Sequence, residues 1–205
     1  MTIFTATECL AWGALDVPIF GIAKDCDGVD FQPAAGFALV QDPSRLWFIA
    51  NHRKAAELHP QARPGAFQMD LWRYDAAELF ISDPQSGRYL EFNLAPNGAW
   101  WTCEFTAPRV RADEADIAMP EVATFAEMAP DGAWLAAMAI PLDLLKARLN
   151  FGESSKINVA MILNSPAQKF LSFNPLGPEE RDFHRPSHFS RVVLMPLPPS
   201  TPPEL

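Results

Sequence analysis

The stretch 71–104, LWRYDAAELFISDPQSGRYLEFNLAPNGAWWTCE, decides the fold because it predicts three consecutive antiparallel strands. Two turn signals divide it, DPQSG at residues 83–87 and PNG at residues 96–98. Both consist of residues that preset turn dihedral angles or tolerate a positive φ. The runs that flank these turns are strand-like, so the stretch reads as a three-stranded meander.

The middle strand has one apolar and one polar face, because polar and apolar residues alternate from Tyr89 to Leu94. A four-residue loop at 95–98 would place Asn93 opposite Trp100 and Phe92 opposite Trp101. This register predicts that Trp101 points into the core and that Trp100 joins the polar face.

For the first hairpin, a four-residue loop is preferred over a five-residue loop, because of the two only the four-residue loop sets Leu79 and Ile81 beside Leu90 and Phe92. It also brings Glu78 onto the polar face. That face combines aromatic rings with fixed hydrogen-bonding groups, as recognition of a polyhydroxylated ring requires. Its predicted members are Glu78, Phe80, Tyr89, Glu91, Asn93 and Trp100.

The remaining chain predicts an all-β fold, an antiparallel β-sandwich with jelly-roll or immunoglobulin-like layers. About ten strands are expected, among them a hairpin of 36–40 with 45–51 and later strands at 157–163, 169–173 and 189–194. One short helix is expected at 141–149, with Pro in its first turn and basic residues near its end. We expect residues 1–195 to form a single domain and residues 196–205 to form a Pro-rich tail.

The charge composition argues against two classes of partner. The chain of 205 residues carries 16 Lys and Arg against 25 Asp and Glu, a formal net charge of −9. The electrostatic field of a chain with this negative charge repels phosphate groups, so neither a nucleic acid nor a membrane is expected as a partner. Without a basic leader the simplest location is the cytoplasm, although a chain given without its leader would be exported. The oligomeric state is left open.

Four short blocks in order carry a resemblance to a known family. They are LWRYDAAELF (71–80), YLEFN (89–93), GAW with IP (132–141) and DFHRPSHF (182–189). The ordered set resembles the family 9 carbohydrate-binding modules and the wider DOMON-like group. Members of that family are β-sandwiches that bind sugars between two aromatic side chains, and some hold structural calcium.

The resemblance implies that Trp72 is one aromatic wall of a sugar site and that Glu78 accepts hydroxyl hydrogen bonds. Sugar-binding members have a second tryptophan in a late loop, where this chain has Phe173. The leading hypothesis is therefore a non-catalytic carbohydrate-binding domain that needs no cofactor, structural calcium aside. Its expected ligand-binding residues are Trp72, Glu78, Arg88, Glu91, Asn93, Trp100 and Phe173.

Two alternatives remain. Glu78 and Glu91 are diagonal neighbours on the polar face, roughly 7–8 Å apart at the backbone, so they could form the carboxyl pair of a glycoside hydrolase. Some DOMON-like domains hold haem, and His184 and His188 are four residues apart. Pro186 lies between these histidines and argues against one helical face presenting both to a metal.

Overall fold

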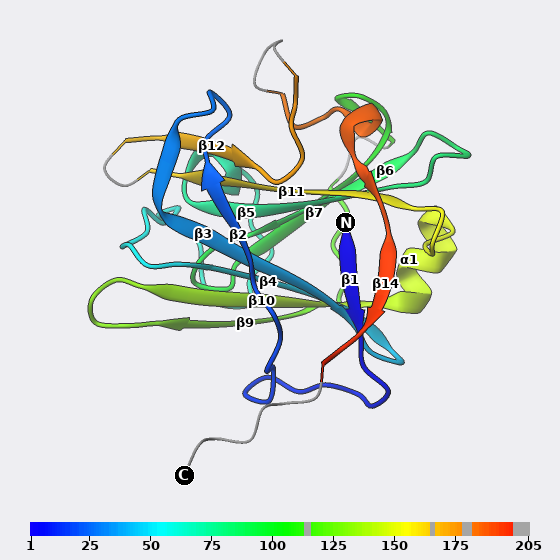
Figure 1. The fold of residues 1–205 in the computed structure, drawn as a ribbon, viewed down its shortest axis with the longest axis horizontal. Helices are drawn as coiled ribbons and strands as arrows, with labels where there is room; N and C mark the ends of the chain where they lie inside the picture. Colours follow the sequence, from blue (N-terminus) through cyan, green and yellow to red (C-terminus); the bar gives the residue numbers. More distant parts are fainter. Residues whose placement is uncertain (113–115, 165–166, 178–181, 199–205) are drawn as a thin grey trace.

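The computed structural model describes residues 1–112, 116–164, 167–177 and 182–198, and within these ranges the chain forms two packed, mostly antiparallel β-sheets of seven strands each (Figure 1). The first sheet has the order β14-β1-β3-β4-β10-β9, and β2 also pairs with β3. Its strands are β1 (Thr2–Thr5), β2 (Phe20–Lys24), β3 (Asp30–Gln41), β4 (Arg45–His52), β9 (Ala123–Met128), β10 (Trp134–Pro141) and β14 (Val193–Pro196).

The second sheet has the order β12-β11-β5-β6-β7-β8, and β13 also pairs with β11. Its strands are β5 (Ala76–Ser82), β6 (Tyr89–Leu94), β7 (Trp100–Ala107), β8 (Val110–Arg111), β11 (Lys156–Leu163), β12 (Lys169–Ser172) and β13 (Ser190–Arg191). The predicted all-β sandwich is therefore confirmed. The meander β5-β6-β7 lies at the middle of the second sheet.

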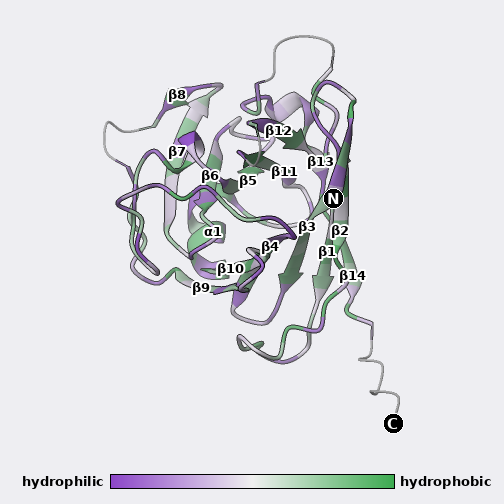
Figure 2. Cartoon of the chain, turned by 90° about the vertical axis from the view of Figure 1, so that its left-hand side faces the viewer, coloured by the Kyte–Doolittle hydropathy of each residue, from purple (hydrophilic) through white to green (hydrophobic). Residues whose placement is uncertain are grey.

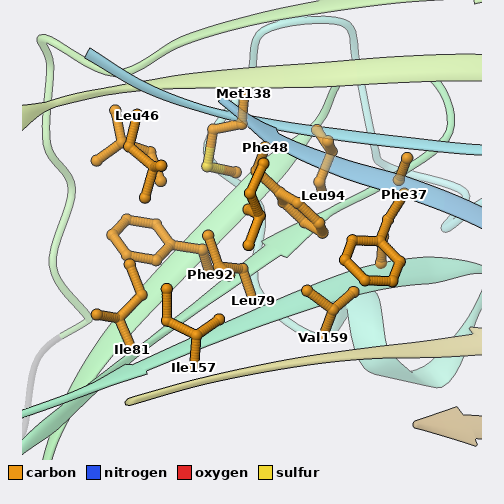
Figure 3. Packing of buried hydrophobic residues seen from close by; sticks show 14 of the residues in the cluster. Phe37, Leu46, Phe48, Leu79, Ile81, Phe92, Leu94, Met138, Ile157 and Val159 are labelled. Atoms are coloured by element: carbon orange, nitrogen blue, oxygen red, sulfur yellow. The ribbon is translucent and has the colours of Figure 1, made fainter. Parts of the chain in front are cut away.

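The hydrophobic core lies between the two sheets. Phe37, Phe48 and Met138 of the first sheet pack against Leu79 and Phe92 of the second (Figure 3), and all five are fully buried. Hydrophobic residues accordingly fill much of β3, β5 and β11 (Figure 2). Burying a side chain of this size contributes about 1.5–3 kcal/mol, so the interleaved faces hold the sheets together.

The predicted helix is confirmed as α1 (Leu142–Leu149), which lies at one end of the sandwich (Figure 1). Leu142, Leu145 and Leu149 recur at helical spacing and are buried in the main core. Two single-turn helices, η1 (Leu71–Arg73) and η2 (Pro186–His188), lie in loops. None of the helices in the described part of the chain has the length and apolar character needed to cross a bilayer.

The strand predicted at 189–194 is in fact two short strands in different sheets. Ser190 and Arg191 of β13 pair with β11 in the second sheet, whereas β14 pairs with β1 in the first. Val192 is buried between them. Here the chain crosses from one sheet to the other, which the strand-like composition of residues 189–194 cannot reveal. β14 also extends to Pro196, the first residue of the predicted tail.

The β5–β6 hairpin has the predicted four-residue loop. The Asp83 N–H donates to the Arg88 carbonyl at 2.9 Å, and the ladder pairs Leu79 with Phe92. The Asp83 carboxylate closes the turn by accepting the Gln85 N–H and the Ser86 hydroxyl, both at 2.9 Å. Glu78 therefore shares a face with Asn93, its directly paired residue.

The register predicted for the β6–β7 hairpin is wrong by one residue. The ladder pairs Asn93 with Trp101 and Leu94 with Trp100. The loop holds three residues, 96–98, because Ala95 donates its N–H to the Ala99 carbonyl and Gly98 takes a left-handed φ of 84°. A one-residue shift exchanges the faces, so Trp100 enters the core and Trp101 lies on the polar face.

Candidate functional site

A cavity of about 570 Å³ lies against the outer face of the second sheet. Strands β5, β6, β7, β11 and β12 contribute its floor, and η1, the β7–β8 turn with β8, and the segment before η2 contribute its sides. Its lining residues are Trp72, Arg73, Glu78, Glu91, Trp101, Phe105, Arg109, Arg111, Ile162, Gln168, Phe170, Phe183 and His184. We call it the sheet-face cavity.

Two indoles meet at the sheet-face cavity. Trp72, half-buried on η1, lies with its ring centroid 5.0 Å from that of Trp101, at an interplanar angle of 58°. Trp101 is buried on β7, and the Arg111 guanidinium lies 5.4 Å from its ring centroid. Trp72 is thus the more exposed indole, resting on a fixed aromatic floor.

Two carboxyl groups occupy the same floor. Glu78 and Glu91 are only 3% and 4% exposed, and they are diagonal neighbours because Glu91 pairs with Phe80 across the ladder. Burial raises the pKa of Glu91 to about 7. Burial, and then the nearby charge of Glu91, raise the pKa of Glu78 well above its ordinary value. The pair therefore holds a proton near neutral pH.

Glu91 is held in place by its neighbours. The Asn93 side-chain amide donates to Glu91 Oε1 at 2.7 Å, and His184 Nε2 lies 3.5 Å from Glu91 Oε2. The Arg109 N–H donates to the Tyr89 hydroxyl, which leaves that hydroxyl free to donate to His184 Nδ1 at 2.8 Å. His184 Nε2 then carries the ring proton and points it toward Glu91.

His184 is neutral at neutral pH, because burial and then the Arg109 charge lower its pKa to about 4. Burial also raises the pKa of the Tyr89 hydroxyl. The chain Tyr89–His184–Glu91 is therefore a set of oriented dipoles that end on one carboxylate. Glu78 differs, since its side chain has no hydrogen bond with any residue in the described ranges.

The cationic side chains around the cavity already have partners. Arg109 binds Asp182 through two hydrogen bonds, of 2.8 and 3.3 Å, and Arg111 binds Asp116 at 2.7 Å. Arg73 lies 3.5 Å from Asp70. Each guanidinium charge is thus balanced by a carboxylate outside the cavity lining.

The structure brings some of the predicted site residues together and separates others. Trp72, Glu78 and Glu91 line the cavity, and Asn93 lies beneath it, bound to Glu91. The rest lie elsewhere. Trp100 is in the core against Phe67, Arg88 is bound to Glu104, and Phe173 packs edge-on against Phe37.

Several cavity residues carried too weak a sequence signal to be predicted. Trp101 was assigned to the core because of the register error. For Arg109 and Arg111, nothing in the local sequence shows that the β7–β8 turn folds over the sheet. His184 stood out in the sequence only for the haem alternative, because its neighbours in space, Tyr89 and Glu91, lie more than 90 residues away along the chain.

The two histidines of the metal alternative have separate partners. His184 accepts from Tyr89, whereas His188 Nδ1 lies 3.2 Å from the Pro175 carbonyl. In the part of the chain that the structure describes, no group of three or more His, Cys, Asp or Glu residues could hold a metal ion.

A second, larger cavity of about 760 Å³ lies at the first sheet. Gly21, Gly36, Asn51, Leu135 and Glu127 form one row across β2, β3, β4, β10 and β9, and the two glycines lower the floor. The indole in its lining, Trp134, is only 3% exposed. This cavity, the glycine-row cavity, therefore lacks an exposed aromatic face.

Comparisons with known proteins identify solved structures that have a similar fold. No family model matches the chain, and no curated protein matches it in sequence. Among solved structures, one similar protein is from Bacteroides uniformis and is provisionally described as carbohydrate-binding. It has a TM-score of 0.69 and 17% identity, over 95% of this chain and 98% of that one.

Two further similar structures are of a family 9 carbohydrate-binding module from Caldicellulosiruptor kristjanssonii. The complex with glucose has a TM-score of 0.61 and 12% identity, over 99% of both chains. The complex with cellotriose has a TM-score of 0.61 and 13% identity, over 98% of this chain and 99% of that one. At these identities the likeness concerns the backbone, and the chain therefore has the β-sandwich fold of the family 9 carbohydrate-binding modules.

Proposed function

We propose that the chain binds a carbohydrate in the sheet-face cavity without transforming it. The observation that carries the proposal is that one cavity is lined by the half-buried indole of Trp72 and by the carboxyl of Glu78, which no described residue hydrogen-bonds. The fold supports it, since two similar structures are complexes with glucose and cellotriose.

The indole and the carboxyl would contact different parts of a sugar. A sugar ring has an apolar C–H face that buries area against an indole, while its hydroxyls need hydrogen-bonding partners. Glu78 offers two oxygens that no described residue occupies, and a buried group of this kind forms strong hydrogen bonds. Glu91 is fixed by Asn93 and adds a second, pre-oriented acceptor.

Of the seven residues expected from the sequence, the proposal keeps Trp72, Glu78 and Glu91 as ligand-binding. Asn93 becomes a positioning residue for Glu91, because it lies beneath the cavity and is fully buried. Trp101 takes the place that had been assigned to Trp100. Arg88 and Phe173 are left out, because their contacts lie outside the cavity.

The test is a calorimetric titration of the chain with a panel of mono- and oligosaccharides. We expect saturable binding that Trp72→Ala weakens by about tenfold to a hundredfold, as loss of a stacking indole does. Trp12→Ala is the matched control, because Trp12 is also half-buried but stacks on Phe125 at the outer face of the first sheet.

Two results would count against the proposal. Equal loss of affinity in the Trp72→Ala and Trp12→Ala variants would place the ligand elsewhere. Release of reducing sugar that Glu78→Gln abolishes would show that the carboxyl pair performs hydrolysis instead.

A further inference from the structure

Among the described residues, no Lys or Arg side chain forms a hydrogen bond or salt bridge with the carboxyl pair at the floor of the sheet-face cavity. Glu91 receives an amide N–H from Asn93 and faces the neutral His184, and Glu78 has no hydrogen bond with a described residue. Buried carboxyls are ordinarily paired with a cation or protonated. Something other than a side chain of the described residues must therefore meet the negative charge of this pair when both groups ionise.

The arginines around the cavity offset this negative charge only in part. The Arg109 charge acts to lower the pKa of both carboxyls and the Arg111 charge acts to lower that of Glu91, but within the described residues neither guanidinium is hydrogen-bonded to the pair. Arg109, Arg111 and Arg73 are bound to Asp182, Asp116 and Asp70, as described above. Counting only the described residues, the three ion pairs are balanced and the imidazole is neutral, so the two ionised carboxyls give the cavity lining a formal charge of −2. The net charge of −9 on the whole chain adds an attractive field for cations.

We propose that the ligand is an amino sugar with a free, protonated amino group, and that its ammonium lies between Glu78 and Glu91. The inference rests on the proposed function, since it names the class of sugar bound at the same site. The ring of the sugar lies against Trp72, and its ammonium donates to the carboxyl oxygens on the floor.

Binding of the ammonium changes the number of protons on the carboxyl pair. In the free protein the carboxyl pair retains one proton near neutral pH. On binding, the ammonium supplies the positive charge, Glu78 loses its proton to the solvent, and both carboxyls then accept charge-assisted hydrogen bonds. A cation near the indole faces of Trp72 and Trp101 is further stabilised by the negative charge density of the rings.

The experiment compares glucosamine, glucose and N-acetylglucosamine by calorimetry on the whole chain, at a pH where the amine is charged. N-acetylglucosamine is the critical comparison, because it keeps the position of the nitrogen and loses its charge. We expect glucosamine to bind at least about tenfold more tightly than either neutral sugar. Its binding should release a proton, measured from titrations in two buffers of different ionisation enthalpy, and that of glucose should not.

Glu78→Gln should bring the ratio of glucosamine to glucose affinity close to one and abolish the proton release. Glu127→Gln, in the glycine-row cavity, should leave both unchanged. Equal affinities for the three sugars, with binding that still depends on Trp72, would overturn the amino-sugar inference and leave the proposed function standing. Absence of binding to every sugar in both panels would overturn both.

Discussion

At the scale of single residues, the main feature of the sheet-face cavity is its two buried carboxyls, Glu78 and Glu91. Both have raised pKa values, but their surroundings differ. A hydrogen bond from Asn93 partly opposes the effect of burial on the pKa of Glu91. For Glu78, burial and the charge of Glu91 both raise the pKa. A carboxyl in that position destabilises the fold unless a ligand or a proton neutralises it. Under the proposed function the bound ligand supplies this neutralisation, and the free protein is less stable because it lacks it.

The pH dependence of stability tests this directly. The ordinary pKa of Glu78 is 4.5, and its pKa in the folded protein is well above that value. The folded state therefore binds the proton more tightly than the unfolded state, and Glu78 lowers the free energy of unfolding progressively as pH rises above 4.5. Glu78→Gln removes this effect, so the variant should gain stability relative to wild type as pH rises from 4.5 to 8.

The measurement is the difference between the urea denaturation midpoints of wild type and Glu78→Gln at each pH. A difference is needed because His184 changes the stability of both proteins with pH, in the direction opposite to Glu78. Its folded pKa of about 4 lies below its ordinary 6.5, so its contribution is lost as pH falls through that window, in both proteins alike. A constant difference between variant and wild type across this range would show that Glu78 is not a strained carboxyl.

Sequence alone could group Trp72, Glu78 and Glu91, which line one cavity in the structure. The two carboxyls share a strand face by simple alternation, and the block around Trp72 carries the family resemblance. Arg109 and His184 could not be identified, because their roles depend on a turn and a late segment that fold over the sheet. Such contacts have large sequence separations and leave no periodic pattern.

At the scale of elements, the β6–β7 hairpin controls which tryptophan reaches the cavity. Gly98 ends the loop with φ at 84°, and the Asn97 side chain accepts the Ala99 N–H at 3.1 Å. This three-residue loop and a four-residue loop are both compatible with the letters PNG. The choice between them reverses the faces of Trp100 and Trp101, so it could not be made from local sequence.

Gly98→Ala should lower the free energy of unfolding by about 1–2 kcal/mol, since a left-handed conformation disfavours a Cβ. The added Cβ would also lie 3.4 Å from the Ala126 Cβ. Gly152→Ala is the control, because its nearest neighbour is 3.9 Å away and its φ is not positive. Chemical denaturation measures both, and a Gly98→Ala variant as stable as Gly152→Ala would contradict the loop assignment.

A second link between elements joins α1 to the second sheet. Glu104 of β7 is buried and accepts hydrogen bonds from Arg88, beside the β5–β6 turn, at 2.7 Å and from Arg148 of α1 at 3.1 Å. The arginines are partly exposed, so solvent screens part of the attraction.

We expect Glu104→Gln to lower the free energy of unfolding by about 1–2 kcal/mol while leaving sugar affinity unchanged. Lys24→Ala breaks the exposed pair with Asp30 and should change stability by less than about 0.5 kcal/mol. Thermal and urea denaturation compare the two variants. Equal, small effects would mean that Glu104 does not anchor α1.

At the scale of the whole molecule, described residues line a cavity against each of the two sheets, and these cavities differ in chemistry as well as in size. The glycine-row cavity is larger, but its indole is buried. The sheet-face cavity is smaller and combines an accessible indole with a carboxyl that has no hydrogen bond from the described part of the chain. The fold could be predicted from strand patterns and ordered blocks, whereas the choice of cavity needed the register and the placing of distant loops.

The crystal structure of the chain with a bound sugar is the most direct test of the central claim. We expect the sugar ring against Trp72, with a hydroxyl or amino group within hydrogen-bonding distance of the Glu78 carboxyl. A sugar bound between Gly36 and Glu127, with Trp72 uncovered, would contradict the account.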